Sequence, residues 1–228
     1  MAQPALTRRN RLLGTAKTVD ELARTIVVIA LPMEAAGVFA AARIPVLYCG
    51  VGKVNAAINL SKELSRYAHR VEAMPLVVNF GSAGSRCHAA GSFVACHKFV
   101  QRDMDVSGLG FPVGVTPYDE APARLSFDPV FTHLPAAVCG TGDSFATADT
   151  LVDCDVLDME AYALAKACWQ ENAKFACVKY ITDGADHTAA DDWQRNVHKA
   201  AEDFLQLFRG LQRMGSATAR LADDSPRL

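Results

Sequence analysis

Three acidic side chains stand beside apolar runs of the chain, and together they could do acid–base chemistry. Glu34 and Asp183 each follow an apolar, β-branched run, and Glu160 lies among apolar residues. Each of them alone is compatible with a helix cap or a solvated turn. Three carboxylates gathered at one edge of a sheet, however, can raise the pKa of one member and supply both a general acid and a general base.

The surroundings of Glu160 are unusual for a charged residue. Residues 156–169 read VLDMEAYALAKACW, in which the other charged side chains are Asp158 and Lys166. A carboxylate is rarely buried without a partner or a function. Glu160 is therefore a candidate functional residue, whereas Asp158 and Asp143 are also good helix N-cap candidates.

Several common site motifs are absent or incomplete. GVGK at 50–53 has neither the spacing nor the Ser or Thr of a phosphate loop, and it lacks the third glycine of a dinucleotide-binding fingerprint. It fits a tight turn into a helix or a loop where backbone approaches a ligand. No HExxH, GxSxG or metal-like His/Cys spacing occurs. We therefore expect no metal ion and no cofactor.

The apolar pattern predicts strands that alternate with helices around these residues. Strands are expected within the segments 25–31, 74–84, 91–106, 134–147 and 174–186, the first two as buried strands. Segment 46–70 is expected to start as a strand and, after a glycine turn, to continue as a helix with apolar residues at 54, 57, 58, 60 and 64. Further helices are expected at 32–43 and at 189–214, the second with Asp191 or Asp192 as N-cap.

This alternation indicates an α/β domain with a largely parallel sheet. In such sheets ligands bind beyond the carboxyl ends of the strands, which is where the small and acidic residues of this chain recur. We expect residues 1–24 to be an N-terminal extension, 25–214 the folded domain and 215–228 a disordered tail.

The amino-acid composition and charge pattern argue against some classes of protein. The chain has 228 residues and a net charge of −2, with no basic stripe, so nucleic acid is not an expected partner. Its seven cysteines show no CxxC and no regular spacing, which fits a reducing cytoplasm. A basic start followed by the apolar run at 25–31 resembles a leader peptide, but a polar stretch separates the two and the run is too short to span a membrane.

The motifs VIALPMEA, GVGKVNAA, VVNFGSAG, GTGDSF, LDMEAYALA and VKYITDGAD resemble, in this order, the nucleoside phosphorylase superfamily. The resemblance covers residues 25–212 and is strongest to the 5′-methylthioadenosine/S-adenosylhomocysteine nucleosidases. It implies a three-layer α/β/α catalytic domain with a mixed, largely parallel sheet. The implied activity is hydrolysis of the N-glycosidic bond of a 5′-modified adenosine, a small-molecule nucleoside, with release of the free base.

The resemblance also implies roles for individual residues. By position, Glu160 corresponds to the carboxylate that binds the ribose hydroxyls, Asp183 to the acid that protonates purine N7, and Glu34 to the base that activates water. The implied substrate-binding residues are Met159 on the sugar, Ser82, Ala83 and Gly84 along base and ribose, Val51 at the 5′ group, Phe145 on the base, Trp193 near a lid, and Asp158.

The segment 103–111 resembles one that reaches into a neighbouring subunit's site. The resemblance therefore implies a homodimer in which Val106, Leu109 and Phe111 complete the partner's pocket.

Two alternatives stay open at this stage. A phosphate co-substrate needs cations or a dense set of N–H donors. The family's phosphorylases keep arginines after the first strand and before the glycine loop, where this chain has Glu34, Asn79 and Phe80. Hydrolysis is therefore favoured, with Arg86 as the residue that keeps phosphorolysis open. A storage or binding protein without catalysis is the other alternative, against which the presence of all three acids argues.

The sequence does not define the 5′ group. Only 15 residues separate Glu34 from GVGK, and the stretch after Phe145 is short as well. Methylthioadenosine, adenosylhomocysteine, 5′-deoxyadenosine, a futalosine-like nucleoside and a nucleotide are all compatible with these features.

Overall fold

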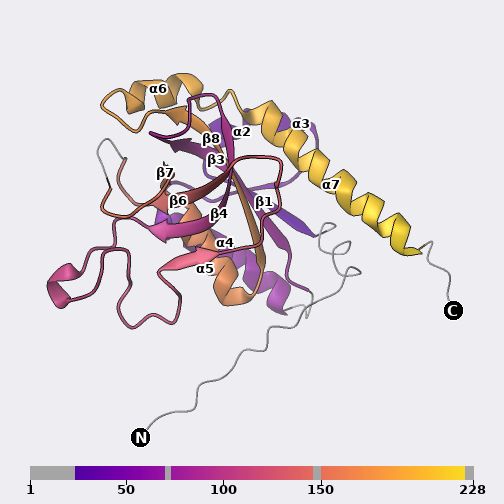
Figure 1. Ribbon diagram of the computed structural model, residues 1–228. Helices are drawn as coiled ribbons and strands as arrows, with labels where there is room; N and C mark the ends of the chain where they lie inside the picture. The colour runs from indigo at the N-terminus through magenta and orange to yellow at the C-terminus, as the bar shows by residue number, and fades with distance from the viewer. Residues whose placement is uncertain (1–23, 70–72, 146–149, 224–228) are drawn as a thin grey trace, which may run out of the picture.

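The computed structural model describes residues 24–69, 73–145 and 150–223, which form helices around one mixed β-sheet (Figure 1). Of the segments predicted to flank the domain, residues 1–23 and 224–228 lie outside the described residues. The α/β class with a largely parallel, mixed sheet is confirmed.

The sheet contains eight strands in the described part of the chain. They are β1 (Thr25–Ile29), β2 (Val46–Tyr48), β3 (Leu76–Gly84), β4 (Phe93–Gln101), β5 (Arg124–Ser126), β6 (Ala136–Thr141), β7 (Val156–Asp158) and β8 (Lys174–Asp183). β2, β1, β3 and β8 are parallel neighbours in this order, and β4 runs antiparallel to β8. β4 also pairs with β6, which runs parallel to it, and with β5, which runs antiparallel to it.

The short strand β7 brings two distant parts of the chain together. It runs parallel to β6 and antiparallel to β3, where Gly84 pairs with Leu157. Because Gly84 also pairs with Asp183 on its other side, the carboxyl ends of β3, β7 and β8 meet at one point. The residues that follow β7, including Glu160, are thereby delivered to the same edge as Asp183.

Helices cover both faces of the sheet (Figure 1). They are α2 (Pro32–Ala35), α3 (Val38–Ala41), α4 (Lys53–His69), α5 (Ala161–Glu171), α6 (Ala189–Asn196) and α7 (Ala201–Asp223), with a 3₁₀ turn, η1, at Ser107–Leu109. α4 and α5 pack on one apolar core, and α3 and α7 pack on another. In the part of the chain that the structure describes, no helix is long and apolar enough to cross a membrane.

The strand sequences explain the two cores. In β1, Val27 and Ile29 point into the core under α3 and α7, whereas Ile26 and Val28 point into the core under α4 and α5. Successive side chains of a strand point to opposite faces, so a continuous apolar run is what a strand buried on both faces requires.

The helix at 32–43 was wrongly predicted to be continuous. The structure has two short helices there, because Ala36 and Gly37 adopt left-handed backbone conformations with φ of 44° and 75°. Such conformations cannot continue a right-handed helix.

The predicted helix at 189–214 was also wrong in its continuity. It divides into α6 and α7, and α6 begins after Thr188 rather than at Asp191 or Asp192. α7 then extends to Asp223, so residues 215–223, which we expected in a disordered tail, are helical.

One face of α4 carries exposed apolar side chains. Of the apolar residues in this helix, Leu60 and Leu64 are buried, but Val54 and Ile58 are 67% and 61% exposed. α4 therefore keeps two large apolar side chains on the surface, close to the turn that carries Val51.

Candidate active site

A cavity of about 350 Å³ opens at the point where the carboxyl ends of β3, β7 and β8 meet. Glu34, Glu160 and Asp183 all line it. All seven non-acidic residues expected to bind substrate within one chain also line it: Val51, Ser82, Ala83, Gly84, Phe145, Met159 and Trp193. The structure thus gathers residues from the whole length of the domain around one hollow.

Glu34 is held in place by hydrogen bonds that all end on its carboxylate. It lies in α2, where its Oε2 accepts from the backbone N–H of Leu31 at 3.0 Å. Its Oε1 accepts from Ser82 twice, from the backbone N–H at 2.9 Å and from the hydroxyl at 2.8 Å. With only 3% of its surface exposed, Glu34 is a fixed acceptor at the wall of the cavity.

Glu160 precedes α5 and faces the glycine turn before α4. Its Oε1 accepts a hydrogen bond from the backbone N–H of Gly52 at 2.9 Å. Burial raises the pKa of Glu160 to about 7, the charge of Asp158 adds to the rise, and Lys179 and the Gly52 hydrogen bond oppose it. The GVG turn is therefore a place where backbone contacts a functional carboxylate.

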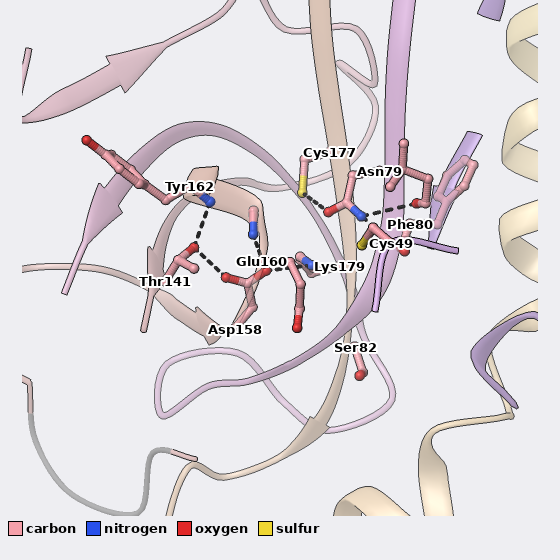
Figure 2. A network of polar contacts seen from close by, with 12 residues as sticks. Cys49, Asn79, Phe80, Ser82, Thr141, Asp158, Glu160, Tyr162, Cys177 and Lys179 are labelled. Atoms are coloured by element: carbon pink, nitrogen blue, oxygen red, sulfur yellow. Dashed lines mark hydrogen bonds and ion pairs between the residues drawn. The ribbon is translucent and has the colours of Figure 1, made fainter. Parts of the chain in front are cut away.

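Beneath Glu160 lies a buried ion pair that sequence analysis missed (Figure 2). Lys179 Nζ is 2.8 Å from Asp158 Oδ2, and both side chains are almost fully buried. Burial alone raises the pKa of Asp158, but the charge and hydrogen bond of Lys179 outweigh it and lower that pKa. The same attraction raises the pKa of Lys179, so both groups are ionised.

Asp158 is also tied into the backbone around it, as Figure 2 shows. Its Oδ1 accepts from the Thr141 hydroxyl at 2.5 Å, and its Oδ2 accepts from the N–H of Ala161 at 2.8 Å. Thr141 in turn accepts from the N–H of Tyr162 at 2.8 Å. Asp158 lines the cavity, but its oxygens are occupied by these contacts, which fix the start of α5.

Asp183 ends β8 with both carboxyl oxygens engaged by neighbours. The Thr182 hydroxyl donates to Oδ2 at 2.7 Å, and the N–H of Ala185 donates to Oδ1 at 3.0 Å. Burial and the nearby charges of Asp192 and Asp186 nevertheless raise the pKa of Asp183. A side chain at Gly84 would place its Cβ 2.5 Å from Asp183 Oδ1, so glycine is required there.

Ion pairs and a hydrogen bond connect the chain segments at the rim of the cavity. The Lys53 ammonium lies 2.6 Å from Asp103 Oδ1 and 3.6 Å from Asp143 Oδ2. Asp143 Oδ1 also accepts from the N–H of Lys53 at 2.7 Å, so Asp143 caps α4 from a different part of the chain. This network holds the Gly52 turn against the segment that precedes Phe145.

Cations are scarce around the cavity. Among the described residues that line it, Arg102 is the one cationic side chain, and Lys179 lies beneath the cavity, paired with Asp158. The Arg102 guanidinium donates to the carbonyl oxygens of Gly142 and Ser144 and to the Ser144 hydroxyl. Arg86 does not line the cavity; it donates to the carbonyl oxygen of Ala185 at 3.2 Å.

Three predicted residues lie elsewhere. Val106, Leu109 and Phe111 are not among the residues that line the cavity, and Leu109 is 74% exposed. Sequence analysis in turn missed Arg102 and Gln194 at the cavity and Lys179 beneath it. A lysine inside the apolar run KFACVKYITD was the available signal for Lys179, since a buried charge needs a partner.

The raised pKa of Glu160 predicts how stability depends on pH. A carboxyl whose pKa rises on folding favours the neutral form in the folded protein, so its contribution to stability is full below pH 4.5 and is lost as pH rises through about 7. We expect Glu160→Gln, which stays neutral, to gain about 2–3 kcal/mol more in unfolding free energy at pH 8 than at pH 5. Urea titrations at the two pH values measure this difference.

The matched control is Glu171→Gln, which neutralises a partly exposed carboxylate at the other end of α5. It should change stability by the same small amount at both pH values. An equal gain for Glu160→Gln at pH 5 and pH 8 would contradict the assignment.

Comparison with known proteins shows which family has this fold and this cavity. The family model described as the phosphorylase superfamily matches residues 35–213. The 5′-methylthioadenosine/S-adenosylhomocysteine nucleosidases of Anoxybacillus flavithermus and Marinomonas sp. are 29% and 30% identical to this chain. The first match covers 72% of this chain and 78% of the relative, and the second covers 73% and 79%.

Solved structures show the same fold at lower identity. The nucleosidase of that name from S. pneumoniae with a transition-state inhibitor has a TM-score of 0.70 and 20% identity, covering 82% of this chain and 98% of that one. The futalosine hydrolase of Helicobacter pylori has a TM-score of 0.69 and 17% identity, covering 82% and 97%. With its family model, its relatives and its fold in agreement, this chain belongs to the phosphorylase superfamily, among the relatives of the 5′-methylthioadenosine/S-adenosylhomocysteine nucleosidases.

Proposed function

We propose that this protein is a purine nucleosidase. It hydrolyses the N-glycosidic bond of a 5′-modified adenosine such as methylthioadenosine or adenosylhomocysteine and releases the free base. The names of the relatives support this activity. The observation that carries the proposal is the convergence of Glu34, Glu160 and Asp183 on one cavity that is poor in available cations.

Asp183 is suited to protonate the leaving base. When the bond between C1′ and N9 breaks, its electron pair moves into the purine, and a proton on N7 neutralises the charge. A donor must hold its proton near neutral pH, and the raised pKa of Asp183 favours this. Phe145, which lines the same cavity, offers an aromatic face for the base.

Glu160 is suited to stabilise the sugar. Cleavage passes through an oxocarbenium-like state, in which contacts to the 2′-hydroxyl strengthen by several kcal/mol. The anion of Glu160 can accept from the ribose hydroxyls while Met159 packs on the ring. Since its pKa is about 7 in the empty site, the hydroxyl donors and the developing positive charge favour its ionised form on binding.

Glu34 is suited to take a proton from the attacking water. Water adds its oxygen to C1′, and its proton passes to the carboxylate, while the proton on N7 comes from Asp183. After one turnover Glu34 therefore carries a proton and Asp183 has lost one, and proton exchange with solvent restores the starting state of both.

The charge of the cavity favours water over phosphate as the nucleophile. A phosphate dianion would meet three acidic side chains, while the Arg102 guanidinium is directed at backbone carbonyls and Lys179 is paired with Asp158. Phosphate sites need cations or N–H donors that are free to bind it.

We also infer that the functional unit is a homodimer. Leu109 is 74% exposed, and Val54 and Ile58 add exposed apolar area on α4. Val106, Leu109 and Phe111 lie on the segment that Asp103 fastens to Lys53 at the rim of the cavity. A second copy that covers this area would receive these side chains at its own pocket, and large exposed apolar patches commonly mark such contacts.

The cytoplasm is the compartment we propose for this reaction. All seven cysteines are free, and five of them are buried. Unpaired buried thiols suit a reducing environment.

Replacement of the proton donor tests the activity. We expect Asp183→Asn to lower the rate of adenine release from methylthioadenosine by about 10²–10⁴-fold, because the amide cannot donate a carboxyl proton. Chromatography of the base measures the rate. Asp191→Asn, which neutralises an exposed acid in the first turn of α6, is the control and should retain the wild-type rate. A wild-type rate in Asp183→Asn would remove it as the general acid.

The dimer proposal predicts a loss of activity on dissociation. Ile58→Glu places a charge on the exposed apolar face of α4 and should yield a monomer whose kcat/KM is lower by about tenfold or more, since pocket residues are lost. Its melting temperature should change much less. Met214→Glu, an equally drastic change at a 53% exposed position on α7, is the control. Full activity in a monomer proven by ultracentrifugation would refute the shared site.

A further inference from the structure

A hydrogen-bonded chain links α6 to the carboxylate of Glu34. The indole N–H of Trp193 donates to the Ser82 hydroxyl at 3.0 Å. The Ser82 hydroxyl donates to Glu34 Oε1 at 2.8 Å. Trp193 lies in α6, Ser82 in β3 and Glu34 in α2, so these two hydrogen bonds connect three elements of the fold.

The direction of each proton in this chain is fixed by chemistry. An indole nitrogen is a donor only, so Ser82 Oγ must accept from Trp193. A serine hydroxyl has a single proton, and Glu34 Oε1 is the acceptor within reach of it. The indole therefore occupies one lone pair of the hydroxyl and leaves its proton directed at Glu34.

A count of donors and lone pairs also identifies the free acceptor position on the carboxylate of Glu34. A carboxylate has about four lone-pair sites, two on each oxygen. Oε1 receives the Ser82 N–H and the Ser82 hydroxyl, so both of its sites are occupied. Among the described residues, Oε2 receives a hydrogen bond from the N–H of Leu31 alone and keeps one site free.

α6 is itself anchored to the other catalytic edge. The Asn196 side chain donates to the carbonyl oxygen of Thr182 at 2.8 Å, and the Thr182 hydroxyl contacts Asp183. Ala189 near the start of α6 and Val197 at its end are buried. The indole therefore belongs to a helix that is held against the end of β8.

We propose that Trp193 is a positioning residue, which acts through Ser82 to hold Glu34 so that Oε2 takes the proton from water. The inference rests on the proposed hydrolysis, because it assigns the atom of Glu34 that acts as base. A phenylalanine at this position would keep an aromatic ring there but could not donate a hydrogen bond, so the N–H itself carries the effect.

A double-mutant cycle tests whether Trp193 acts through Ser82. We expect Trp193→Phe to lower kcat about threefold to tenfold, the range for loss of one hydrogen bond, and to change KM by less than about twofold. In a Ser82→Ala background the same replacement should have no further effect on kcat. Trp169→Phe, the matched ring change in α5, should leave kcat unaltered. Equal falls in both backgrounds, or no fall in either, would overturn the proposal.

A second readout does not depend on turnover. The indole N–H of Trp193, identified in nitrogen-15 NMR spectra by its absence in Trp193→Phe, should exchange slowly with solvent in the wild-type protein and faster in Ser82→Ala. Unchanged exchange in Ser82→Ala would mean that the hydrogen bond does not form, which overturns the proposal. Absence of turnover in the wild-type protein would instead count against the proposed hydrolysis, so the two failures are distinguishable.

Discussion

The buried pair of Lys179 and Asp158 is the interaction on which the arrangement of the site depends. Removing two charges from water costs several kcal/mol each, and the cost is offset only where geometry and extra hydrogen bonds are favourable. Here the ions are 2.8 Å apart, and Asp158 also accepts from Thr141 and from the N–H of Ala161. These contacts join β8, β7, β6 and the start of α5, and so determine where Glu160 lies.

The pair also shapes the electrostatics of the cavity. Asp158 raises the pKa of Glu160 and Lys179 lowers it, so burial remains the main cause of the shift. Glu34, Glu160 and Asp183 are each at least nine-tenths buried. Buried acids reduce stability near neutral pH unless a ligand pairs with them, and such a cost is common at sites that need a dry, preorganised environment.

Much of the fold was predictable from the sequence because the core strands are long and apolar. β1, β3 and β8 lie within predicted segments, and the acids were found because each stands beside such a run. β7 was missed, since three residues before an apolar helix carry no separate periodicity. The partner of Lys179 and the contact from Trp193 to Ser82 were not predictable, because residues 21 and 111 positions apart leave no trace in local patterns.

The most direct test of the account is the product formed from methylthioadenosine and related 5′-modified nucleosides, measured by chromatography with phosphate present and with phosphate removed. Attack by water at a cavity lined by three carboxylates predicts free base and free sugar at the same rate in both conditions. Formation of a sugar 1-phosphate, with turnover that needs phosphate, would contradict hydrolysis. Binding of nucleosides with no product at all would contradict catalysis itself.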